Sequence, residues 1–157
     1  MPFVFAYGSI MKSSEMKHTC SSAESKGMAC LPGRRVVFNG SSKAWGGAGA
    51  ADLTADPDSA VWGVIWDLSD EDVERLDRRE GVPHSYTPCE VEVVDPAGDG
   101  LVANTYTRPH PQQERAPSVA YAQAILEGAS ENNLPTEYQD TLRQWIREAG
   151  CRLADQQ

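Results

Sequence analysis

The segment that ends the first apolar run of the chain has the features of a ligand-binding turn. Gly8 and Ser9 stop an apolar segment, residues 2–7, that is typical of a strand. Glycine allows a sharp bend, and the successive amides of residues 7–10 can point together at a carboxylate or a developing oxyanion. A strand can also end in Gly-Ser without any further role. The turn alone leaves both interpretations open.

Glu80 is the candidate general base. It stands at the expected end of a charged helix, directly after Arg78 and Arg79 and before Gly81. A carboxylate that projects from a helix end into a cleft would be partly desolvated, and its pKa would rise toward neutrality, as a base requires. A glutamate among arginines can equally form a solvated ion pair. Composition alone does not separate Glu80 from the other glutamates.

The other reactive side chains have spacings that do not favour nucleophilic or metal chemistry. Ser9 lacks the G-x-S-x-G setting of an activated serine, and the three histidines fall in expected loops. The four cysteines are expected to be reduced thiols, and their spacing fits no zinc motif. We therefore expect no metal site. Tyr7, Tyr86 and Tyr121 could supply hydroxyl groups, although Tyr121 on a helix face is also typical of a core residue.

Length, composition and charge limit the classes of protein to consider. A chain of 157 residues with 40% hydrophobic residues fits one domain, residues 1–157. The net charge of −9, with basic residues scattered among acidic ones, argues against nucleic acid as a partner. No apolar run approaches the roughly 20 residues of a membrane span, and no export signal opens the chain. We expect a cytoplasmic protein without a membrane partner.

Strands are expected to dominate the first two thirds of the chain. Alternating or continuous apolar patterns predict strands at residues 2–7, 29–31, 34–38, 61–66, 86–94 and 101–106. The run at 61–66 is the most hydrophobic and is expected at the centre of the sheet. Pro32-Gly33 is expected to interrupt the second strand, and a Gly-rich loop around Trp45 is expected at residues 40–49.

Helices are expected to position Glu80 and Tyr121. Ser69 is a candidate cap for a helix that begins at Asp70 and that Gly81 ends. Pro117-Ser118 introduces a second helix, which carries Tyr121 and which Gly128 closes, and a third follows Pro135 as far as Gly150. Strands followed by helices predict an α+β domain, with a largely antiparallel or barrel-like sheet and helices on one side.

Four ordered motifs together resemble the γ-glutamylcyclotransferase family. They are Phe5-Ala6-Tyr7-Gly8-Ser9, the run at 61–66, the segment 76–82 with Tyr86 and 91–93, and the tail motif at 128–139. The resemblance extends from about residue 3 to residue 143. It implies a small mixed β-barrel with flanking helices and a reaction that releases 5-oxoproline from a γ-glutamyl compound without a cofactor.

The resemblance also implies a role for each matching residue. It assigns Glu80 as the catalytic acid/base and Tyr121 as a contact to the substrate. The substrate-binding turn comprises Val4, Phe5, Ala6, Tyr7, Gly8 and Ser9. The pattern departs at Ile10 and Met11, where the family often has Asn-Leu.

The departure at Ile10 and Met11 motivates an alternative, a non-catalytic small-molecule-binding protein on the same fold. The expected partner is a small γ-glutamyl compound. The leaving amine or amino acid stays open, as does a homodimer.

Overall fold

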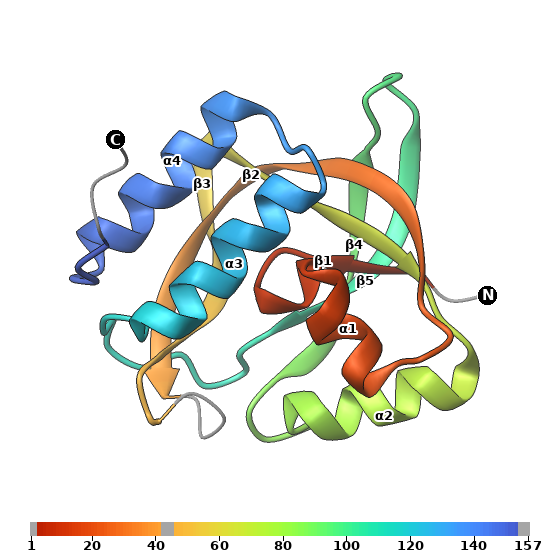
Figure 1. Cartoon of the computed structure of the whole chain (residues 1–157), viewed down its shortest axis with the longest axis horizontal. Helices are drawn as coiled ribbons and strands as arrows, with labels where there is room; N and C mark the ends of the chain where they lie inside the picture. Colours follow the sequence, from red (N-terminus) through yellow and green to blue (C-terminus); the bar gives the residue numbers. More distant parts are fainter. Residues whose placement is uncertain (1–2, 42–45, 154–157) are drawn as a thin grey trace.

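The computed structural model describes residues 3–41 and 46–153 (Figure 1). The elements in chain order are β1 Phe3–Ala6, the short 3-10 helix η1 Ser9–Met11, α1 Ser13–Thr19, β2 Glu24–Ser41, β3 Gly49–Asp67, α2 Asp70–Glu80, β4 Thr87–Val94, β5 Gly100–Thr107, α3 Val119–Glu131 and α4 Thr136–Glu148. Pro2 and residues 42–45 of the expected loop around Trp45 lie outside the described residues.

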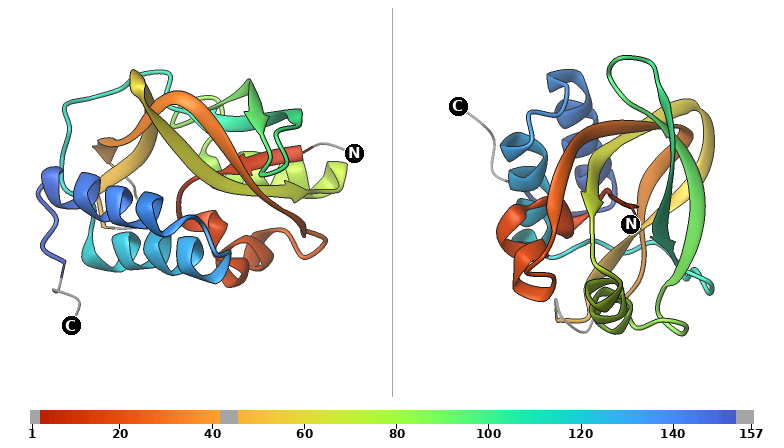
Figure 2. Two further views of the ribbon diagram at one scale, coloured as in Figure 1. Left: turned by 90° about the horizontal axis from the view of Figure 1, so that it is seen from above. Right: turned by 90° about the vertical axis from the view of Figure 1, so that its right-hand side faces the viewer.

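The five strands close into a barrel in the order β1-β3-β2-β4-β5. Only the β1–β5 pairing among these is parallel, and the other strand pairs of the described chain are antiparallel. β3 pairs on both sides, and Val61 and Val64 within it are fully buried. The predicted small, mixed, largely antiparallel barrel is confirmed. Figure 2 shows α3 and α4 together on one side of the strands and α2 apart from them.

The predicted break at Pro32-Gly33 is wrong, because β2 is one long strand that runs through it. β2 pairs with β3 on both sides of this point, and the register shifts between Pro32 and Arg34. Gly33 has a φ of +79°, which a glycine adopts without steric cost. The sheet therefore accommodates the Pro-Gly pair as a bulge and does not end there.

Gly128 does not end α3, contrary to expectation, because the helix continues to Glu131. A Cβ at position 128 would lie 2.7 Å from the Lys12 amide nitrogen and 2.9 Å from the Met11 Cβ. The glycine therefore allows α3 to approach the turn that follows β1. Asn132 strengthens this contact, since its Nδ2 donates to the Met11 carbonyl at 2.9 Å. α3 thus supports the segment that contains Gly8 and Ser9.

α2 begins and ends at the predicted residues. The Ser69 hydroxyl accepts a hydrogen bond from the Asp72 amide at 3.2 Å, as a helix cap does. Gly81 has a φ of +71° in the left-handed region, and its amide donates to the Arg78 carbonyl. Glu80 is the last residue before this tight ending. The cap fixes the direction in which the helix end points.

α4 buries one apolar face, as predicted. Tyr138, Leu142, Trp145 and Ile146 are the buried residues of this helix, and α4 packs against α3 and β2. Within the described ranges, no helix has the length and apolar character needed to cross a bilayer.

Candidate active site

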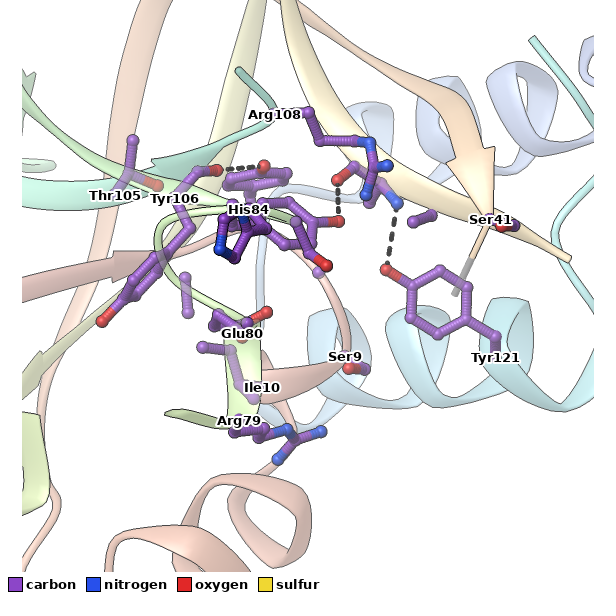
Figure 3. Close-up of a pocket in the computed structure, with 18 of the residues that line it drawn as sticks. Ser9, Ile10, Ser41, Arg79, Glu80, His84, Thr105, Tyr106, Arg108 and Tyr121 are labelled. Carbon is purple, nitrogen blue, oxygen red and sulfur yellow. Dashed lines mark hydrogen bonds between the residues drawn. The ribbon is translucent and has the colours of Figure 1, made fainter. Parts of the chain in front are cut away.

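One pocket of about 630 Å³ contains most of the predicted site residues. That volume lies in the range typical of small-molecule sites. Its lining includes residues 5–10 from the turn, 50–51 from β3, 79–81 at the end of α2, 84–86 after it, 105–106 and 108 from the end of β5, and Tyr121 from α3. Figure 3 shows these segments converging. Val4 lies outside the lining and is buried in the barrel wall, paired with Trp66 and Asn104.

The turn after β1 uses its carbonyl groups internally and leaves two amides for other partners. The carbonyls of Gly8 and Ser9 accept from the amides of Met11 and Lys12, each at 3.1 Å. Within residues 3–41 and 46–153, the amides of Gly8 and Ser9 donate no hydrogen bond. The Tyr7 hydroxyl donates to the Tyr106 carbonyl at 2.6 Å and so ties the turn to β5.

Gly8 borders open space in the pocket, and its φ is not one that requires glycine. Its φ is −113°, a value open to any residue. A Cβ at this position would lie 3.6 Å from the Tyr121 hydroxyl and 3.8 Å from the Ala51 Cβ. The missing side chain therefore leaves open the part of the pocket between the turn and Tyr121. The expected close approach of backbone to ligand is sterically available at this point.

Glu80 faces the pocket without the ion pair that its arginine neighbours suggest. Arg79 is engaged with Glu15, donating to its carbonyl at 3.0 Å and lying 3.4 Å from its carboxylate. The Glu80 carboxylate accepts no hydrogen bond in the described part of the chain. Burial raises the pKa of Glu80 to about 7, with a smaller raising effect from Asp77 and a lowering effect from Arg79. At neutral pH such a group exchanges protons readily in both directions.

Tyr121 and Tyr86 form hydrogen bonds with the two backbone polar groups of Ala51, its amide and its carbonyl. The Ala51 amide donates to the Tyr121 hydroxyl at 3.1 Å, and the Tyr86 hydroxyl donates to the Ala51 carbonyl. Figure 3 draws the hydrogen bond at the Tyr121 hydroxyl as a dashed line. Burial raises the pKa of Tyr121 to about 12, so its hydroxyl is neutral at pH 7. Tyr121 is both a core residue, edge-on to Phe38, and a lining residue of the pocket.

Ile10 lines the pocket with an apolar side chain, at the position where the sequence motif departs from the family pattern. Its exposed fraction is 7%, and it lines the same pocket as Glu80, where Figure 3 labels both residues. Met11, the second departure, is fully buried and packs against Gly128. Apolar packing beside a carboxylate disfavours the charged form. Ile10 thus places an apolar side chain in the pocket that contains Glu80.

Arg108 also lines the pocket, although it belongs to none of the four sequence motifs. It follows β5 directly, and its guanidinium lies 5.3 Å from the centre of the Tyr86 ring. No sequence motif marks it, because its neighbours Gly40 and Tyr86 come from distant parts of the chain. Within the described ranges, no group of three His, Cys, Asp or Glu side chains has an arrangement suited to a metal ion.

The barrel and its ligand-sized pocket define a small-molecule-binding domain of a recurring fold, and comparisons with known proteins identify the family. Residues 60–142 match the AIG2-like family. The γ-glutamylcyclotransferase of Bos taurus is 33% identical over 143 residues, covering 88% of this chain and 75% of that protein. The Homo sapiens γ-glutamylcyclotransferase is 33% identical over 144 residues, with coverages of 88% and 76%.

A solved structure supports the same grouping. A γ-glutamyl cyclotransferase superposes with a TM-score of 0.85 and 31% identity, covering 90% of this chain and 86% of that chain. The chain therefore belongs to the γ-glutamylcyclotransferase family of AIG2-like proteins and is an enzyme of that family. The resemblance inferred from the four motifs is confirmed.

Proposed function

We propose that this protein cyclises a γ-glutamyl compound and releases 5-oxoproline and a free amine, with Glu80 as the general acid and base. The observation that carries the proposal is the partly buried Glu80 carboxylate, which shares one pocket with the turn at Gly8 and with Tyr121. The names and identities of the relatives support the same reaction.

The first step is removal of a proton from the substrate. At neutral pH the α-amine of a γ-glutamyl compound is an ammonium group, which has no lone pair for attack. Glu80 accepts one of its protons, and the neutral amine then attacks the γ-carbonyl carbon of the same glutamyl group. The attack is intramolecular, so holding the substrate folded replaces a covalent enzyme nucleophile and can supply about 7 to 11 kcal/mol.

The second step is collapse of the tetrahedral intermediate. The γ-carbonyl oxygen becomes an oxyanion, and the amides of Gly8 and Ser9 are the donors that we assign to the glutamyl group and this oxygen. One such donor is worth roughly 2.7 to 4 kcal/mol in other enzymes. Protonated Glu80 gives its proton to the leaving nitrogen as the amide bond breaks. The ring nitrogen, which still carries two hydrogens, passes one of them to the released amine, which departs as an ammonium ion. The products are 5-oxoproline and the amine, and Glu80 is again a carboxylate.

Tyr121 and the residues beside the turn complete the proposed binding site. The Tyr121 hydroxyl faces the space that Gly8 leaves open, so we assign it a contact to the glutamyl group. Phe5, Ala6, Tyr7 and Ser9 line the pocket as part of the turn, whereas the proposed role of Val4 is limited to supporting the strand. We further propose that residues 1–157 form a single domain and that the enzyme acts in the cytoplasm.

The direct test is release of 5-oxoproline from γ-glutamyl-alanine by the purified protein, with alanine measured in equal amount. The matched control is α-glutamyl-alanine, which has the same atoms but carries the amide at the α-carbonyl, so cyclisation cannot free the alanine. We expect turnover of the γ isomer alone. Binding of γ-glutamyl compounds with no product after long incubation across a panel of leaving groups would contradict the proposal and favour a non-catalytic binding protein.

A further inference from the structure

Arg108 brings a positive charge to the pocket that no carboxylate neutralises among the described residues. It lines the pocket directly after β5, and its side chain takes part in no ion pair in residues 3–41 and 46–153. Arg79, the other arginine of the lining, is held by Glu15. The charge of Arg79 is therefore used within the fold, whereas the charge of Arg108 is available to a ligand.

The Arg108 guanidinium is held in place by packing. It lies over the Tyr86 ring at 5.3 Å, a cation–π contact. Gly40, with a φ of +79°, leaves the space it occupies, because a Cβ there would lie 2.3 Å from the Arg108 Nη2 atom. The buried Nε atom has no hydrogen-bond partner in the described chain. Packing therefore fixes the position of the group but leaves its charge without a counter-ion.

Asp52, a buried carboxylate that contacts the Arg108 backbone, is occupied by other donors. Its Oδ1 accepts from the Arg108 backbone amide at 3.0 Å, and its Oδ2 accepts from the Asn39 side chain at 2.9 Å. Asp52 therefore holds the backbone of Arg108 rather than its guanidinium. The start of the Arg108 side chain is fixed, and its end extends along the pocket wall.

Arg108 and Glu80 approach the pocket from different sides. Figure 3 shows the Arg108 side chain entering from the end of β5 and Glu80 from the end of α2, near Ile10. Both charges affect Tyr86. Burial is the main cause of its raised pKa, the charge of Glu80 raises this pKa further, and the charge of Arg108 lowers it. When the glutamyl end of a substrate lies at Gly8 and Glu80, the side of the pocket lined by Arg108 remains open to the leaving group.

We propose that Arg108 determines specificity by binding a carboxylate on the leaving group. The inference rests on the proposed function and narrows it to γ-glutamyl amino acids or peptides over γ-glutamyl amines. A planar guanidinium binds a carboxylate through paired charge-assisted hydrogen bonds, and a charge held without a counter-ion is already oriented for that contact. Arg108 makes no contact with the reacting atoms in this assignment.

A matched substrate pair isolates this contact. γ-Glutamyl-alanine and γ-glutamyl-ethylamide differ only in the leaving-group carboxylate. We expect Arg108→Gln to raise the KM for γ-glutamyl-alanine about 10- to 100-fold with kcat within about twofold, and to leave the ethylamide kinetics unchanged. Arg108→Lys keeps the positive charge but cannot form the paired hydrogen bonds of a guanidinium. We expect it to recover part of the preference for γ-glutamyl-alanine over the ethylamide. Arg143→Gln, a charge-matched change on α4 outside the pocket lining, should alter neither substrate.

Two results would overturn the inference while leaving the proposed function intact. Equal losses on both substrates would mean that Arg108 serves the glutamyl end or the fold, and equal kinetics of wild type and Arg108→Gln would mean that it binds nothing. If the wild-type protein releases no 5-oxoproline, the proposed function fails instead. In that case the binding of both compounds is measured by calorimetry, with Glu80→Gln protein and with the Glu80→Gln/Arg108→Gln double variant. Tighter binding of γ-glutamyl-alanine than of the ethylamide that disappears with Arg108→Gln supports the inference. Equal binding of the two compounds to Glu80→Gln protein refutes it.

Discussion

Two carboxylates on α2, Asp72 and Glu80, respond to burial in opposite ways. Asp72 is the more buried, with 1% of its surface exposed, yet its pKa lies below the usual value. The Ser22 hydroxyl and amide and the Arg75 guanidinium donate to it and stabilise the charged form. Glu80 has no such donors in the described chain, and burial raises its pKa to about 7. The hydrogen-bond donors around a carboxylate, and not the depth of its burial, therefore decide whether it is structural or suited to proton transfer.

Position along the helix adds to the difference. Asp72 lies in the first turn of α2, where the unpaired amides favour negative charge, whereas Glu80 is the last residue, where the unpaired carbonyls disfavour it. The same side-chain chemistry placed at the two ends of one helix therefore has two uses. Asp72 joins α2 to the segment before β2, and Glu80 is left for the pocket.

The largest expected effect is the loss of turnover in Glu80→Gln. Glutamine keeps the shape of the side chain but cannot accept the substrate proton, so kcat should fall about 10²- to 10⁴-fold. The measurement is 5-oxoproline release from γ-glutamyl-alanine. Asp72→Asn is the matched control on the same helix and should retain the kcat of wild type per folded molecule. Wild-type turnover in Glu80→Gln would remove Glu80 from the mechanism.

The next largest effect is on stability, in Asp72→Asn. The change removes the charge that Ser22 and Arg75 stabilise, and we expect unfolding free energy at pH 7 to fall by about 2 to 3 kcal/mol. Because the folded-state pKa of Asp72 is lowered, its contribution is present above the ordinary value of 3.8 and is lost as pH falls below it. Urea unfolding at pH 7 and near pH 3 measures the difference, which should narrow in acid. A constant difference would contradict the hydrogen-bonding account.

Glu80→Gln should change stability in the opposite direction, by a smaller amount. The folded-state pKa of Glu80 is about 7 against an ordinary 4.5, so the folded protein binds a proton between these values that the unfolded chain does not. Wild-type stability therefore falls as pH rises through this window. Allowing for partial exposure, we expect Glu80→Gln to be more stable at pH 8 by about 1 to 2 kcal/mol and equal near pH 4. Lower stability at pH 8 would indicate a favourable contact of the carboxylate.

The smallest effect is expected from Ile10→Asn, which introduces a polar group beside Glu80. The rise of kcat/KM with pH in the wild type should have a midpoint near pH 7, because only ionised Glu80 acts as the base. Asparagine would stabilise the charged carboxylate, so the midpoint should move down by roughly half a pH unit. A pH–rate profile of both proteins measures it. An unchanged midpoint would mean that Ile10 does not contribute to the desolvation of Glu80.

The sequence was sufficient for the elements whose determinants are local. The cap at Ser69, the end at Gly81 and the apolar face of α4 follow from residues within one or two turns, and each lies where it was predicted. Glu80 and the turn at Gly8 are candidate site residues because they belong to motifs in a recognisable order, and they line one pocket. The exposure and partners of these residues depend on packing, which no local pattern encodes.

The features that the sequence did not reveal depend on contacts between distant segments. Pro32 and Gly33 have the composition of a break, yet pairing with β3 on both sides holds the strand together. Gly128 is a residue type that often ends a helix, yet here it lies within α3 and allows close contact with Met11 and Lys12. Arg108 becomes significant only when Gly40 and Tyr86 surround it. A glycine can mark a turn, a helix end or a close approach, and only the fold distinguishes them.

Closure of the barrel through β1 has a consequence for the order in which the protein acquires activity. The Thr105 hydroxyl donates to the Phe5 carbonyl across 100 residues of chain, and β1 pairs with both β3 and β5. Such pairing of distant segments is slow, because the loop between them must close first. During synthesis, β1 cannot form its pairing with β5 until β5 has left the ribosome. Binding competence should therefore appear late in folding, after most of the secondary structure.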